Sequence, residues 1–180
     1  MVKNMIKSIS LFFSLLGFSA VCACGGDTGG PDDAATASDV QAACDAICSE
    51  DDRCDADGPD ENCRADCLEE NAFYAGNVRA DILDGLRACF AGLTCEESED
   101  SCAERALESV GLSLEDATKD ADVQTCLAKQ HECAGTTDSF SDDMCLLLAF
   151  LVSSSRATAA SCYQKSCTEI DACTAPVFGD

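Results

Sequence analysis

The sequence predicts an all-α protein, built from disulfide-stapled helical hairpins or a small helical bundle, and three observations support this. Sixteen of the 180 residues are cysteine, a density typical of small exported domains closed by disulfides. Apolar residues recur at helical spacing along most of the chain after residue 38. No stretch alternates apolar and polar residues for long enough to indicate a strand.

Caps and apolar spacing give the positions of the helices. The first helix is predicted to begin at Ser38, because Ser38-x-x-Gln41 has the pattern of a capping box. The segment 144–152 is apolar on all sides, which predicts a central buried helix rather than a membrane span of about 20 residues. Further helices are predicted at about 59–74, 77–92, 99–110, 116–133 and 141–165.

Four cysteines predict a cross-linked helical hairpin. Cys44-x3-Cys48 and Cys63-x3-Cys67 each place two sulfurs one helical turn apart on one face. Where two antiparallel helices face each other, the residue numbers of opposed positions add up to a constant. The numbers 44 and 67 add up to 111, and so do 48 and 63. We therefore predict the pairs Cys44–Cys67 and Cys48–Cys63, with pairing elsewhere as the alternative. The arrangement resembles the C-x3-C…C-x3-C scaffold of α-hairpinins over residues 44–67.

Cysteine counts divide the folded part into two predicted modules, 38–112 with eight cysteines and 113–180 with six. Both counts are even, so each module can be closed by its own disulfides. The triplet at 89, 95 and 102 has an echo at 162, 167 and 173, which indicates a diverged internal repeat. The repeat predicts the pair Cys133–Cys145 as the counterpart of Cys48–Cys63, the inner of the two predicted pairs of the hairpin. A single domain that contains both halves is the alternative.

The charge balance argues against two classes of partner. The formal net charge is −23, from 34 acidic and 11 basic residues. Nucleic-acid binders and proteins held at anionic lipid by basic clusters both need local excesses of Lys and Arg. We therefore expect no nucleic-acid partner, and the net charge favours a soluble monomer.

Residues 1–23 have the pattern of an export signal. Two lysines lie within residues 1–7, and residues 9–20 are apolar apart from serines and one glycine. A basic segment followed by an apolar segment of this length is typical of a secretory signal peptide. Residues 24–37, rich in Gly, Asp and small side chains, are predicted to be a flexible tether.

The junction Val21-Cys22-Ala23-Cys24 resembles the lipobox of bacterial lipoproteins, with an aliphatic residue at −3 and a small residue at −1. The resemblance implies that Cys24 is lipidated. Lipidation of Cys22 would place Val21 at −1, where the peptidase prefers a small residue. Loss of Cys22 and lipidation of Cys24 also leave 14 cysteines, an even number. A plain secreted protein, cleaved without lipidation, is the alternative.

The overall layout resembles the cysteine-rich lipoproteins of myxobacteria-like Gram-negative bacteria. The resemblance rests on the acylation site followed by a Gly- and Asp-rich tether and a cysteine-rich remainder. It implies that the protein lies in the cell envelope and is anchored to the outer membrane by an N-terminal lipid. The folded part would then lie on the periplasmic or the surface-exposed side. The resemblance is compatible with an extracellular or periplasmic protein partner. It implies no enzymatic activity.

Sequence motifs for catalysis are absent. His131 is the sole histidine, which excludes two-histidine zinc motifs, and there is no P-loop, G-x-S-x-G, G-x-G-x-x-G or C-x-x-C. We therefore predict a non-enzymatic, lipid-anchored envelope protein with a structural or binding role, with no catalytic residue, metal site or cofactor. An exported enzyme with a site around His131 is one alternative.

A calcium-binding surface protein is the other alternative. Asp55-Ala56-Asp57-Gly58 hints at an EF-hand loop, but Arg53 and Arg64 would occupy its first and last ligand positions. An irregular calcium site remains as a hypothesis, against a simply solvated acidic loop. Its candidate ligands are Asp51, Asp52, Asp55, Asp57, Asp60 and Glu61.

Overall fold

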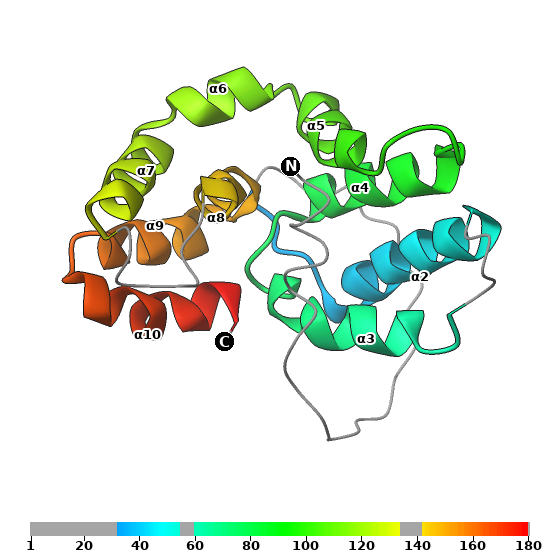
Figure 1. Ribbon diagram of the computed structural model, residues 1–180, viewed down its shortest axis with the longest axis horizontal. Coiled ribbons are helices and arrows are strands. Elements are labelled where there is room, and N and C mark those ends of the chain that lie inside the picture. The colour runs from blue at the N-terminus through cyan, green and yellow to red at the C-terminus, as the bar shows by residue number, and fades with distance from the viewer. Residues whose placement is uncertain (1–31, 55–59, 134–141, 180) are drawn as a thin grey trace.

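The computed structural model describes residues 32–54, 60–133 and 142–179, and within them the fold is all-α, as predicted (Figure 1). The predicted signal segment and most of the predicted tether, with Cys24, lie outside the described residues. The α-helices are α2 (Ala37–Cys54), α3 (Cys63–Glu70), α4 (Ala80–Gly92), α5 (Asp100–Ser109), α6 (Leu114–Lys119), α7 (Ala121–Cys133), α8 (Asp142–Leu146), α9 (Ser153–Cys162) and α10 (Cys167–Phe178). Two 3₁₀ helices are η1 (Ala72–Tyr74) and η2 (Leu147–Phe150).

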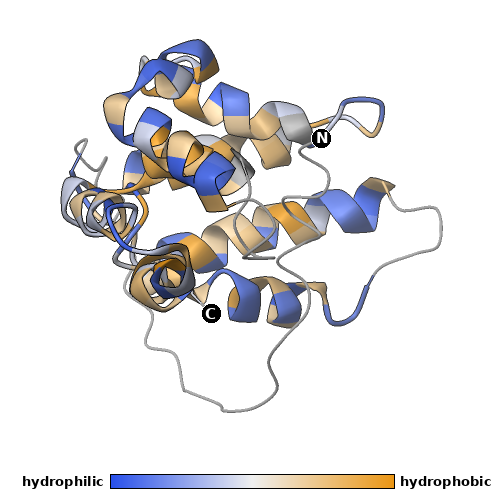
Figure 2. Cartoon of the chain, turned by 60° about the vertical axis from the view of Figure 1, so that its left-hand side comes forward, coloured by the Kyte–Doolittle hydropathy of each residue, from blue (hydrophilic) through white to orange (hydrophobic). Residues whose placement is uncertain are grey.

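The helices form two groups that share one apolar core. In the first group α2 packs against α3 and α4, and α4 packs against α5; in the second, α7 contacts α8 and α9 contacts α10 (Figure 1). Helix α6 connects the groups. Buried side chains of both groups, among them Ile82 of α4 and Leu148 of η2, belong to the same core cluster. Hydrophilic residues gather on the outward helix faces (Figure 2). No helix of the described residues is long and apolar enough to cross a membrane.

Short extended segments join the two groups at the centre. Val78 and Leu151 form an isolated antiparallel bridge. On its two sides the Arg79 N–H donates to the Phe150 carbonyl at 2.9 Å, and the Val152 N–H donates to the Asn77 carbonyl at 2.9 Å. Residues 151–152 directly follow η2 and precede α9, and residues 78–79 follow η1 after a turn at 75–77 and precede α4, so equivalent parts of the two groups meet here.

This junction corrects the prediction of one buried helix over 144–152. The segment is buried at Cys145, Leu148, Phe150, Leu151 and Val152, as its composition predicts. It is nevertheless α-helical only to residue 146, then 3₁₀-helical, then extended. The extended backbone is held by partners about 70 residues away in sequence. These tertiary hydrogen bonds override the local preference of the segment for helix.

The predicted helix 59–74 is α3 followed by η1, and the predicted helix 141–165 is α8, η2 and α9. Side-chain caps are found at three further differences. The predicted helix 116–133 is two helices, because the Asp120 carboxylate accepts from the Asp122 N–H at 2.9 Å and starts α7 afresh. Helix α2 starts one residue before Ser38, since Thr36 and Asp39 cap each other's backbone N–H groups at 3.3 and 2.7 Å. Helix α10 was not predicted, although Ser166 and Glu169 form a capping box in its first turn.

Gly85 allows α4 and α5 to approach closely. A methyl group at this position would lie 2.7 Å from the Ser109 Oγ and 3.0 Å from the Ala106 Cα. Gly85→Ala is therefore expected to lower the free energy of unfolding by about 1–3 kcal/mol, although alanine favours helix. Gly92→Ala, in the same helix with no atom within 4 Å, should leave stability unchanged or raise it. Equal denaturant midpoints for the two variants would contradict the close packing.

Both tyrosines of the chain should resist ionisation. Burial raises the pKa of Tyr74 to about 12, and burial also raises the pKa of Tyr163. The folded state therefore holds phenol protons that the unfolded state releases near pH 10, and stability should fall as the pH rises above 10. Absorbance at 295 nm should stay flat to about pH 11 in native buffer and rise near pH 10 in guanidinium. Native titration near pH 10 would show that a ring is solvated.

Candidate functional site

Four disulfides close the first half of the chain. Cys44–Cys67 and Cys48–Cys63 join α2 to α3 with Cα–Cα distances of 5.7 and 5.8 Å. They are the two pairs that were predicted from the sums of the residue numbers. Cys54–Cys95 then ties the end of α2 to the loop after α4. Cys89–Cys102 closes the α4–α5 hairpin.

Three disulfides close the second half, and they correct one prediction. Cys133 pairs with Cys167, and Cys145 pairs with Cys126, so the predicted pair Cys133–Cys145 is wrong. Cys126 and Cys133 lie two turns apart on the same face of α7. Helix α8 returns beside the first part of α7, which brings Cys145 to Cys126 and leaves Cys133 to α10. Cys162–Cys173 completes the set.

The two halves repeat the same disulfide topology. In each cysteine triplet the outer members pair with each other, and the middle member pairs with the last residue of an earlier helix. The corresponding pairs are Cys89–Cys102 with Cys162–Cys173, and Cys54–Cys95 with Cys133–Cys167. The element order α2, α3, η1, α4, α5 also matches α7, α8, η2, α9, α10. No disulfide joins the halves within the described residues.

His131 is exposed on the last turn of α7, two residues before Cys133. Its ring has no hydrogen bond or ion pair with the described part of the chain. Among the described residues, no acidic or nucleophilic side chain is bonded to the histidine around which an enzyme site was hypothesised.

A hollow of about 310 Å³ lies at the junction of the two halves and contains two arginines. Arg79 donates to Asp81 at 2.6 Å, and Arg156 is held by Asp120 and Asp122. Burial alone would raise the pKa of Asp120, but hydrogen bonds from Arg156 and from the Asp122 N–H lower it overall. Both cations are thus neutralised by neighbouring carboxylates, as in a structural ion-pair network.

The predicted calcium ligands do not form one site in the described residues. Asp55 and Asp57 lie outside them, and Asp52 and Glu61 are exposed. The Asp60 carboxylate accepts from the Asn62 N–H at 2.9 Å, just before α3. Of the six residues, only Asp51 belongs to a cluster of three carboxylates within the described part of the chain, and its partners there are Glu50 and Glu99.

Asp51 lies in an acidic cluster with Glu50 and Glu99. One carboxylate oxygen from each lies within 4.8 Å of the others. Glu50 and Asp51 come from the end of α2, and Glu99 is the N-cap residue of α5. Burial raises the pKa of Glu50, and the charges of Glu99 and Asp51 raise it further against the opposing effect of Arg53.

Sequence reasoning did not single out Glu50 or Glu99. A signal was present for Glu50, which lies three residues after Ile47 and seven after Ala43 on the apolar face of α2. A carboxylate on a buried stripe is unusual and needs a partner. Glu99 had no such signal, because its approach to α2 depends on how α2 packs beside the α4–α5 hairpin.

The fold and the cysteines define this chain as a disulfide-rich all-α protein. Seven disulfides indicate an oxidising, extracellular or envelope compartment. Comparisons with protein-family models, with curated proteins and with solved structures find no match to the chain.

Proposed function

We propose that the protein is a lipid-anchored, disulfide-stapled helical module of the cell envelope with a structural or binding role. The supporting observation is the cysteine balance. All cysteines of the described residues, 14 of the 16 in the chain, are in disulfides. The remaining two, Cys22 and Cys24, lie in the lipobox-like segment, where signal cleavage removes the first and acylation uses the second.

The repeated disulfide topology supports a scaffold role. We infer that the two halves are diverged copies of one helical unit, joined through their equivalent extended segments. Each copy is closed by its own disulfides, and both share a core. Such a unit tolerates an oxidising, variable environment without depending on a large apolar core.

The anchor is tested by intact mass and membrane association of protein produced in a Gram-negative host. We expect an acylated N-terminus at Cys24 and 14 alkylation sites that appear only after reduction. Cys24→Ser should lose the acyl mass while its melting temperature stays unchanged. Cys22→Ser is the matched control and should remain anchored. Free thiols before reduction, or an acylated Cys24→Ser protein, would contradict the proposal.

A further inference from the structure

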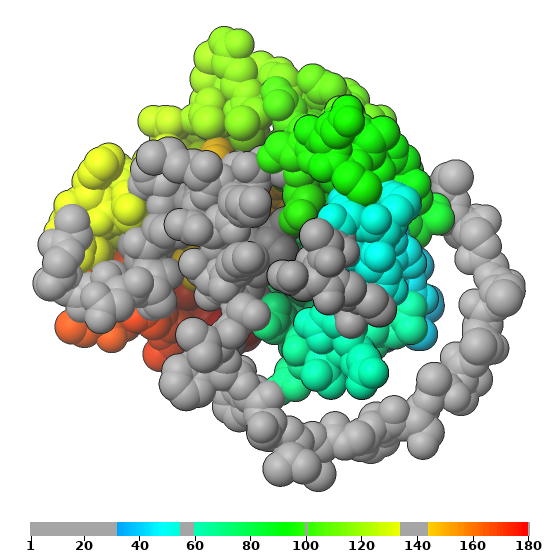
Figure 3. All heavy atoms as spheres, turned by 45° about the vertical axis from the view of Figure 1, so that its right-hand side comes forward, coloured from blue at the N-terminus to red at the C-terminus, as the bar shows by residue number. Residues whose placement is uncertain are grey.

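We propose that the carboxylates of Glu50, Asp51 and Glu99 form a calcium site that joins the end of α2 to the beginning of α5. This inference goes beyond the proposed envelope role and does not depend on lipid anchoring. It requires only the folded, oxidised chain. In Figure 3 the cyan α2 and the green α4–α5 region lie in contact, as their packing requires.

Glu50 is the residue that points to a bound cation. It is only 4% exposed, yet it has no hydrogen bond and no ion pair within the described residues. The other two buried polar residues there are both satisfied: the Ser155 hydroxyl donates to Asn77 at 2.7 Å, and the Thr174 hydroxyl to the Ile170 carbonyl at 3.0 Å. A buried carboxylate without a partner is costly, and a bound cation would offset that cost for Glu50.

The charge of Arg53 lowers the pKa of Glu50, but neither of the nearby arginines forms an ion pair with Glu50 in the described residues. Arg53, one turn after Glu50, donates to the Leu93 carbonyl at 2.6 Å. Arg105 of α5 donates to Glu97 at 2.7 Å. Glu50 and Asp51 lie near the C-terminal end of α2, where the helix dipole disfavours negative charge, whereas Glu99 is the N-cap residue of α5, where the dipole favours it. Two further carboxylates beside Glu50 therefore add repulsion that a divalent cation would remove.

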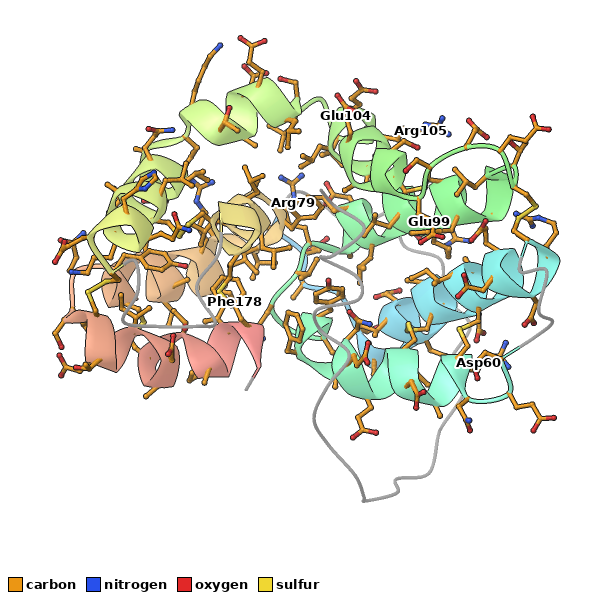
Figure 4. All side chains as sticks on the ribbon, viewed as in Figure 1. Asp60, Arg79, Glu99, Glu104, Arg105 and Phe178 are labelled. Atoms are coloured by element: carbon orange, nitrogen blue, oxygen red, sulfur yellow. A yellow bond between two sulfur atoms is a disulfide. The ribbon has the colours of Figure 1, made fainter. Side chains whose placement is uncertain are left out.

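The geometry and donor type fit calcium. Calcium binds oxygen ligands at about 2.3–2.6 Å, so two oxygens on one ion are at most about 5 Å apart. The three carboxylate oxygens lie within 4.8 Å of one another. Asp51 and Glu99 are half-buried, so water can complete the coordination. Glu99 lies on the side of the α4–α5 hairpin that faces α2, whereas Glu104 of the same helix lies on the outer side (Figure 4).

The second half of the chain has a paired charge at the position equivalent to Glu50. Glu50 lies four residues before Cys54, and the equivalent residue before Cys133 is Lys129. The Lys129 side chain is only 12% exposed and pairs with Glu132 at 2.9 Å. In the second half the charge at this position is therefore paired within the chain, whereas in the first half Arg53, the counterpart of Glu132, donates to the Leu93 carbonyl and forms no ion pair with Glu50 in the described residues.

The test is calcium titration of the oxidised, folded protein by calorimetry and by thermal melting. We expect one calcium ion to bind per chain and Tm to rise by about 5–10 °C at a concentration 100 times the Kd. Glu99→Gln should weaken calcium binding about 10-fold or more. Glu50→Gln should melt above wild type in chelator and show no rise with calcium, because it removes the buried charge.

Glu104→Gln is the matched control, since it makes the same change on an exposed position of α5. It should keep the full calcium response. A wild-type Tm that is the same in chelator and in 10 mM calcium, with no heat of binding, would overturn the site. An undiminished response of Glu99→Gln would show general screening of the acidic surface instead, and would overturn it too. Sodium chloride at matched ionic strength separates these two effects.

Discussion

Reduction of the seven disulfides is expected to unfold the protein at 25 °C in native buffer. The disulfides close loops of 11 to 41 residues in sequence separation. Each native disulfide in a small exported domain contributes about 2–5 kcal/mol, and the whole stability of a domain is about 5–15 kcal/mol. The combined loss therefore exceeds what the apolar core can offset. Helical circular dichroism at 222 nm after reduction and alkylation measures the effect.

The order of reduction provides a second readout. Cys95 is exposed, so the Cys54–Cys95 bond is open to a thiolate or phosphine. Cys126 and Cys145 are both fully buried and should be labelled only after the fold opens. Timed alkylation with mass spectrometry distinguishes early reduction of Cys54–Cys95 from late reduction of Cys126–Cys145. A cooperative melt that survives alkylation of all these cysteines would show that the core alone specifies the fold.

Leu148→Ala is expected to cost about 2–5 kcal/mol, the largest effect of a single apolar substitution considered for this chain. Leu148 is 0% exposed and lies in η2, beside the extended segments that join the two halves. Its removal leaves a cavity in the core that both halves share. Denaturant unfolding under oxidising conditions gives the change in free energy.

Leu114→Ala is the control for this substitution. Leu114 is 39% exposed on α6, so the same truncation should change stability by less than about 0.5 kcal/mol. If Leu148→Ala lowered the unfolding free energy no more than Leu114→Ala, the shared core would be disproved. Two separate unfolding transitions in Leu148→Ala would instead show that the halves fold independently once their contact is weakened.

Local patterns in the sequence were enough for the fold class and for the α2–α3 hairpin. Cysteines four residues apart occupy one face of a helix, and two such pairs on antiparallel helices have one consistent register. Helix α10 could have been predicted in the same way, because its capping box lies within the short segment from Ser166 to Glu169. These features depend on neighbours within a turn or two, which a sequence displays directly.

Tertiary structure alone decided the features that depend on distant partners. Cys126 and Cys133 share a face of α7, so only the packing of α8 and α10 selects Cys145 for one and Cys167 for the other. The helix break after η2 follows from hydrogen bonds to residues 77–79. The acidic cluster arises because α2 packs beside the α4–α5 hairpin, which brings Glu99 to carboxylates 48 and 49 residues earlier in the chain. Helical periodicity describes each face, but it does not say which other face will cover it.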